Sequence, residues 1–111
     1  MVLVVDDEPA IRLLCRVNLE LAGYEVLEAA TIGQAQARLA DGSIDVVLLD
    51  MHVGHERGDT LLRELKERGT PVAAVTGSTD VNSLKGIADA VLSKPFTIDD
   101  LEATVARLAG R

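Results

Sequence analysis

The chain has 111 residues, of which 48% are hydrophobic and 26% are charged, and its formal net charge is −7. This composition predicts one globular domain over residues 1–111 and excludes a disordered or fibrous chain. The acidic balance argues against direct nucleic-acid binding, which needs a basic surface. The sequence shows neither a signal peptide nor an apolar run of membrane-spanning length, and its single cysteine, Cys15, suits a reducing compartment. We therefore expect a cytoplasmic protein without membrane contact.

Short aliphatic runs alternate with amphipathic segments along the sequence. The aliphatic runs predict strands, at residues 2–5, 24–28, 44–49, 71–75 and 90–93. The amphipathic segments predict helices, the first from Pro9 to a stop at Gly23 and the others at 31–40, 59–68, 80–85 and after a capping box over 97–100. Strand–helix alternation with short loops predicts an α/β fold, a parallel sheet with helices on both faces.

Polar residues follow four of the five predicted strands. Asp6 and Asp7 come directly after the first strand, Asp50 after the third, Thr76 after the fourth and Lys94 after the fifth. Because the carboxyl ends of parallel strands meet at one edge of a sheet, we expect these side chains to converge there. Crowded carboxylates repel one another, and a hard divalent cation such as Mg²⁺, which generally comes with phosphate, is the usual reason for the arrangement.

The sequence resembles the receiver domain of two-component response regulators along essentially its whole length. Three phrases carry the resemblance, in order and at strand ends: Val-Val-Asp-Asp-Glu-Pro at 4–9, Val-Val-Leu-Leu-Asp-Met at 46–51 and Leu-Ser-Lys-Pro-Phe at 92–96. The resemblance implies the flavodoxin-like fold, a doubly wound (βα)5 three-layer sandwich whose parallel sheet has the strand order 2-1-3-4-5. It also implies a phosphoacceptor signalling domain that catalyses its own phosphorylation and dephosphorylation, and not a metabolic enzyme.

The resemblance implies a role for each acidic residue of the strand ends. Asp50 would be the phosphoacceptor, which takes its phosphoryl group from a sensor histidine kinase, a phosphotransfer protein or a small donor such as acetyl phosphate. Asp7 would bind Mg²⁺ directly and Asp6 largely through water, while Asp50 and the backbone carbonyl of His52 would complete the protein ligands. The ion would bridge carboxylate and phosphoryl oxygens and offset charge in the transition state.

The resemblance also implies contacts to the phosphoryl oxygens and a conformational switch. The Lys94 ammonium would hold one oxygen and the Thr76 hydroxyl another, and the peptide bond between Lys94 and Pro95 is typically cis in the family. Receivers usually carry an aromatic residue three positions before this lysine, which swings inward when the threonine moves. Here that position is Val91, so the aromatic switch is missing or replaced.

The segment between Thr76 and Lys94 is about one helical turn shorter than in most receivers. We assign the missing turn to the fourth helix, at residues 80–85, which in the family contributes to the surface for dimers and targets. Two hypotheses follow for output: signalling uses the first and fifth helices, or it depends on order and disorder of residues 78–87. The identity of the output partner, and the choice between a monomer and a phosphorylation-dependent dimer, stay open.

His52 and Ser78 occupy the two positions that flank the phosphoryl group in the family, where side chains tune hydrolysis of the acyl phosphate. We expect them to set the phosphoryl lifetime. His52 and His55 also lie near the aspartates in sequence. Because Mg²⁺ prefers oxygen ligands and a zinc site needs His or Cys at tighter spacing, we interpret both histidines as loop residues.

Two other functions fit parts of the pattern. A small phosphohydrolase of the haloacid dehalogenase type also combines an aspartyl nucleophile with Mg²⁺, but it needs a second acid two residues later, where this chain has His52. A degenerate receiver, kept as a phosphate-independent interaction module, usually lacks the acceptor, an acid or the lysine, and this chain has all of them. The phosphorylatable switch is therefore the preferred interpretation.

Overall fold

A parallel sheet forms the middle layer of the structure, a computed structural model that describes residues 1–54, 56–77 and 81–110. Across this sheet the strands follow the order β2 (Val26–Ala29), β1 (Val2–Val5), β3 (Val46–Asp50), β6 (Val72–Thr76) and β7 (Ala90–Ser93). All neighbouring pairs are parallel. Counted within the sheet alone, this is the order 2-1-3-4-5, so the predicted flavodoxin-like topology is confirmed.

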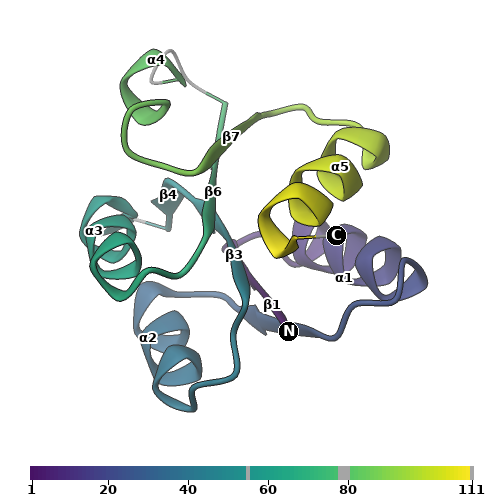
Figure 1. Cartoon of the computed structure of the whole chain (residues 1–111), viewed down its shortest axis with the longest axis horizontal. Helices are drawn as coiled ribbons and strands as arrows, with labels where there is room; N and C mark the ends of the chain where they lie inside the picture. Colours follow the sequence, from purple (N-terminus) through teal and green to yellow (C-terminus); the bar gives the residue numbers. More distant parts are fainter. Residues whose placement is uncertain (55, 78–80, 111) are drawn as a thin grey trace.

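Helices cover both faces of the sheet (Figure 1). One face carries α1 (Pro9–Leu21) and α5 (Ile98–Ala109), and the other carries α2 (Ile32–Ala40), α3 (Asp59–Arg68) and α4 (Val81–Leu84). Among the described residues, no helix has both the length and the apolar character needed to cross a bilayer.

The core is aliphatic and divides along the two faces of the sheet. Successive residues of β1 alternate between them: Val2 and Val4 pack on the side of α1 and α5, and Leu3 and Val5 on the side of α2 and α3. Because both faces are covered, the central strands are buried along their whole length, which is why they read as unbroken apolar runs.

Cys15 belongs to the core on the α1 and α5 side. Its thiol is buried, and this burial raises its pKa to about 11, with the charge of Asp6 acting in the same direction and that of Lys94 against it. A thiol with so high a pKa stays protonated at neutral pH and is a poor nucleophile, so Cys15 is a packing residue.

The two central strands run one residue further than the sequence predicts. β3 includes Asp50, which pairs with Val75, and β6 includes Thr76, which pairs with Ser93. β2 and β3 also begin two residues later than predicted, where their pairing with β1 starts. The predicted site residues Asp50 and Thr76 therefore lie on the last rungs of the sheet, held by strand pairing and not by a flexible loop.

Side-chain caps set the starts of two helices. Thr31 accepts a hydrogen bond from the Gln34 backbone N–H at 3.0 Å, so α2 begins one residue later than predicted. The capping box predicted for the last helix is present, with Thr97 and Asp100 each accepting from the other's backbone N–H.

α4 is a single turn in the described part of the chain, as the shortened segment predicts, and Asp80, its predicted first residue, lies outside the described residues.

Asp89 ties the segment after the short α4 back to the rest of the fold. Its carboxylate accepts from the Lys66 ammonium at 2.7 Å and from the Val72 backbone N–H at 2.9 Å, which joins β7, α3 and β6. Burial alone would raise the pKa of Asp89, but the hydrogen bonds from Lys66 and Val72, with the charge of Lys66, outweigh it and lower the pKa.

We expect Asp89→Asn to lower the free energy of unfolding at pH 7 by about 1–2 kcal/mol, because a charge-assisted bond is lost and a backbone donor is weakened. Since the folded-state pKa lies below the unfolded value of about 3.9, the stability that Asp89 adds is present above that pH and is lost as the pH falls through the folded pKa. Urea unfolding of both proteins at a series of pH values checks this. Asp41→Asn, at an exposed carboxylate, is the control, and an equal effect of both substitutions would contradict the prediction.

Candidate functional site

The carboxyl ends of the strands bring the predicted site residues together. Asp6 follows β1, Asp50 and Thr76 end β3 and β6, and Lys94 follows β7. The exposed fractions of Asp6, Asp50 and Thr76 are 2%, 6% and 1%, whereas Asp7 is exposed and Lys94 is half-buried. The site therefore combines two buried carboxylates with one exposed carboxylate, that of Asp7.

Lys94 lies between the two buried carboxylates. Its Nζ is 3.3 Å from Oδ2 of Asp6 and 3.6 Å from Oδ2 of Asp50. Burial lowers the pKa of Lys94, but the charges of Asp6 and Asp50 and the hydrogen bond to Asp6 outweigh it, so the net shift is upward. The lysine is consequently a fixed positive charge beside the acceptor carboxylate.

The carboxylate of Asp50 is only partly compensated. Burial raises its pKa, and the neighbouring Asp6 and Asp7 add to this, while the backbone N–H of His52 and the ammonium of Lys94 act in the opposite direction without cancelling it. The His52 N–H donates to Oδ1 at 3.1 Å, which orients the carboxylate. Additional positive charge at this position would stabilise the ionised form.

The three aspartates fit a magnesium ion. One oxygen from each of Asp6, Asp7 and Asp50 can be chosen so that all lie within 4.8 Å of one another. Mg²⁺ takes oxygen ligands at about 2.0–2.1 Å, so adjacent ligands are about 2.9 Å apart and opposite ones about 4.2 Å, and the three side chains would draw together around the ion. In the described part of the chain this group holds neither histidine nor cysteine, which favours a hard cation over zinc. His55 lies outside the described residues.

A short hairpin follows Asp50, which the sequence analysis treated as a loop. β4 (His52–Val53) pairs with β5 (Glu56–Arg57) in the antiparallel sense. Val53 is buried in the core while the side chain of His52 is exposed, so the hairpin is anchored on one side and presents His52 beside the site. The alternation of polar and apolar residues over 51–53 was the available signal, but it is too short to define a strand.

Thr76 and Lys94 are joined through the backbone. The Lys94 N–H donates to the Thr76 carbonyl at 2.8 Å, one rung beyond the pair of Thr76 with Ser93. The peptide bond between Lys94 and Pro95 is cis. Val91, the position where an aromatic residue is usual, is half-buried against the core on the α3 and α4 side. Ser78, the second residue predicted to flank the phosphoryl group, lies outside the described residues.

Gly58 is a site-supporting residue that the sequence analysis did not single out. A Cβ at this position would lie 3.1 Å from the backbone oxygen of Asp50 and 3.3 Å from Cγ of Leu49 and Cα of Met51. The backbone before α3 thus packs directly on the end of β3, and its N–H donates to the Met51 carbonyl at 2.9 Å. Only the packing reveals this constraint, because the backbone angles of Gly58 are ordinary.

We expect Gly58→Ala to lower the free energy of unfolding by about 1–3 kcal/mol, because the added methyl group must displace the backbone at Asp50. Gly86→Ala is the matched control, since a Cβ there meets nothing within 4 Å and the change should stay within about 0.5 kcal/mol. Urea denaturation of the two variants measures the difference. Equal stability of both variants would show that the end of β3 adapts freely.

Comparisons with known proteins agree with this fold. The family described as response regulator receiver domain matches residues 2–106, and the chain belongs to this family. Among its relatives, the phosphate regulon transcriptional regulatory protein PhoB of Pseudomonas aeruginosa is 40% identical over 96% of this chain and 49% of its own length. The transcriptional regulatory protein KdpE of Mycobacterium tuberculosis is 37% identical over 93% of this chain and 48% of its own. The chain spans about half the length of these relatives.

Solved receiver structures have the same fold. The receiver domain of NtrX from Brucella abortus has a TM-score of 0.90 at 29% identity, with 99% of this chain and 98% of that chain covered. The response regulator TrrA from Thermotoga maritima, solved in complex with Mg²⁺-BeF, has a TM-score of 0.85 at 30% identity, with 96% of each chain covered. The resemblance inferred from the strand-end phrases is therefore confirmed, and the chain is a signalling domain of the receiver class.

Proposed function

We propose that this chain is a phosphorylation-dependent switch in which Asp50 accepts a phosphoryl group, with Mg²⁺ held by Asp6, Asp7, Asp50 and the backbone carbonyl of His52. The observation that carries the proposal is the position of the Lys94 ammonium, 3.6 Å from the buried Asp50 carboxylate and beside two further acids. A carboxylate in this position can act as a nucleophile only if its charge, and that of the incoming group, is offset locally.

The chemistry is a displacement at phosphorus. A carboxylate oxygen of Asp50 supplies the electron pair for the new O–P bond, while the bond from phosphorus to the donor's leaving group breaks. Bound Mg²⁺ would supply Lewis-acid stabilisation of the phosphoryl oxygens. Lys94 lies where its ammonium can hold a phosphoryl oxygen, and the His52 N–H keeps the acceptor carboxylate oriented. The same elements support hydrolysis of the acyl phosphate by water, which would return the chain to its resting state.

The conformational response would begin at Thr76. A phosphoryl group adds roughly −1.5 to −2 charge at the site, and we propose that the Thr76 hydroxyl moves to contact it. The usual aromatic partner of this movement is replaced by Val91, and α4 is a single turn within the described residues. A population shift toward an active state then depends on changes other than the rotation of an aromatic ring. We propose output through α1 and α5 or through residues 78–87.

We propose a sensor histidine kinase or a phosphotransfer protein as the donor, in the cytoplasm. A groove of about 370 Å³ beside the site supports a protein donor; it is lined by Glu8, Ile11, Leu14, Lys94, Pro95 and Phe96. Leu13 and Val17, also on α1, are exposed apolar residues. Lys94 lines this groove and lies 3.6 Å from Asp50, so a protein that contacts the groove would come close to the acceptor. The output partner, and a monomer against a phosphorylation-dependent dimer, remain to be assigned by experiment.

Incubation with acetyl phosphate and Mg²⁺ should add one phosphoryl group to the chain, because the acceptor and its charge partners are already assembled. Intact-protein mass spectrometry measures the adduct. Asp50→Asn and a parallel sample with EDTA should show none, since the first removes the nucleophile and the second the cation. An adduct that persists in Asp50→Asn would place the acceptor elsewhere, and no adduct in any sample would favour the phosphate-independent interaction module.

His52→Ala should change the dephosphorylation rate of the loaded chain by at least about threefold, because the exposed side chain two residues after the acceptor would orient or restrict the attacking water. Loss of the phosphoryl adduct over time measures the rate. Arg57→Ala is the matched control, since Arg57 is the cross-strand partner of His52 in the hairpin. If both variants decay at the wild-type rate, His52 does not set the phosphoryl lifetime.

A further inference from the structure

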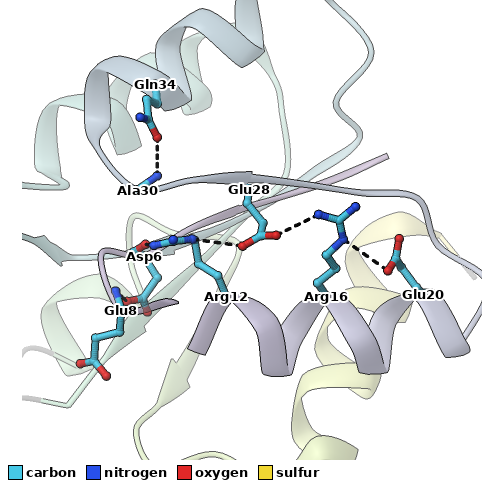
Figure 2. Close-up of polar contacts among 8 residues, drawn as sticks. All are labelled: Asp6, Glu8, Arg12, Arg16, Glu20, Glu28, Ala30 and Gln34. Atoms are coloured by element: carbon cyan, nitrogen blue, oxygen red, sulfur yellow. Dashed lines mark hydrogen bonds and ion pairs between the residues drawn. The ribbon is translucent and has the colours of Figure 1, made fainter. Parts of the chain in front are cut away.

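A polar network links α1 to β2 beside the acidic site (Figure 2). Arg12 donates from Nε to Glu28 of β2 at 3.1 Å and from Nη1 to the backbone carbonyl of Asp6 at 2.8 Å. Arg16, one turn further along α1, donates to the other Glu28 oxygen at 2.9 Å and to Glu20 at 3.3 Å. Arg12 thus joins the network to the loop after β1, whereas Arg16 contacts Glu20 and Glu28, away from that loop.

Asp6 is held at each of its polar atoms. Its N–H donates to the Ala29 carbonyl at 3.1 Å, Oδ1 accepts from the Glu8 N–H at 2.9 Å, and Oδ2 lies 3.3 Å from Lys94. The remaining atom, the carbonyl oxygen, accepts from Arg12. The arginine is itself fixed by Glu28 on the neighbouring strand, so the carbonyl is tied to the sheet and not merely to a mobile side chain.

The carbonyl of Asp6 belongs to the planar peptide unit that leads to Asp7. Its orientation therefore sets where the backbone of Asp7 begins, and Asp7 is the exposed member of the three carboxylates. The bend is also held across Asp7 by the bond from the Glu8 N–H to the Asp6 carboxylate, although the Glu8 side chain makes no cap of its own. Arg12 is the side chain that holds the carbonyl of the peptide between the two aspartates.

We propose that Arg12 is a positioning residue for the cation: clamped by Glu28, it holds the peptide between Asp6 and Asp7 so that both carboxylates can reach one ion. This inference rests on the magnesium site proposed above. The direction of the change in Mg²⁺ affinity distinguishes this inference from simple electrostatics, because a guanidinium near the site repels Mg²⁺. Loss of the charge alone would strengthen cation binding, whereas loss of the positioning contact would weaken it.

Isothermal titration with MgCl₂ on the full chain, without phosphoryl donor, tests the proposal. Arg12→Gln should weaken Mg²⁺ binding about tenfold, as expected for a residue that orients a metal ligand without touching the metal. Arg16→Gln removes the same charge from the same glutamate and should stay within about twofold of wild type. Arg12→Lys keeps the charge, but one ammonium cannot contact both Glu28 and the Asp6 carbonyl as the guanidinium does. This variant should therefore also bind Mg²⁺ more weakly.

Hydrogen exchange at the Glu8 amide, measured without metal, gives a readout independent of the cation. Arg12→Gln should speed this exchange and Arg16→Gln should not, with urea midpoints recorded to confirm that each variant is folded. If Arg12→Gln does not fold, the same measurements are made on Arg12→Lys and Glu28→Gln. If wild type binds Mg²⁺ and Arg12→Gln binds it equally or more tightly, the positioning role is wrong and the proposed function stands. If wild type binds no Mg²⁺, the magnesium site itself fails and the positioning role with it.

Discussion

The ammonium of Lys94, set between the carboxylates of Asp6 and Asp50, is the interaction on which the rest of the site depends. Two almost fully buried carboxylates at neighbouring strand ends repel each other, and each would cost several kcal/mol to hold ionised without a partner. One lysine offsets part of this charge and leaves a negative surplus, to which the exposed Asp7 adds. An edge of this kind is stable enough to fold, and its remaining negative charge is suited to a divalent cation, which would have to be bound before the site could hold an anionic phosphoryl group.

The sheet makes this charge arrangement possible because its strands end in register. Asp50 and Thr76 lie on the last paired rungs, so their positions follow from the ladder and not from loop conformation. Close packing supports the same edge from outside it. Gly58 lets the backbone before α3 lie against the end of β3, and Arg12 ties the loop after β1 to β2. Backbone contacts therefore support the site as much as side-chain contacts do.

Acceptance of the signal and its transmission draw on different parts of the chain. The acids, threonine and lysine lie together at the carboxyl ends of the strands, whereas Val91 stands at the position predicted for an aromatic residue and α4 is one turn long within the described residues. Asp89 anchors the segment after α4 through Lys66 and Val72, which keeps β7 in place although the helix before it is short. The proposed phosphoryl site and the proposed output surface thus lie on different elements of the fold.

The sequence by itself determined the α/β fold class and the five polar residues at the strand ends, because aliphatic runs and helix caps are local properties. The strand order followed from the resemblance of the strand-end phrases to receiver domains. The exact strand ends, the hairpin after Asp50, the tight approach at Gly58 and the reach of Arg12 to Asp6 were decided by the tertiary structure. Each of these depends on backbone atoms of another element coming within bonding or contact distance. No periodicity or spacing in a single chain records such a distance, so only the packed molecule shows it.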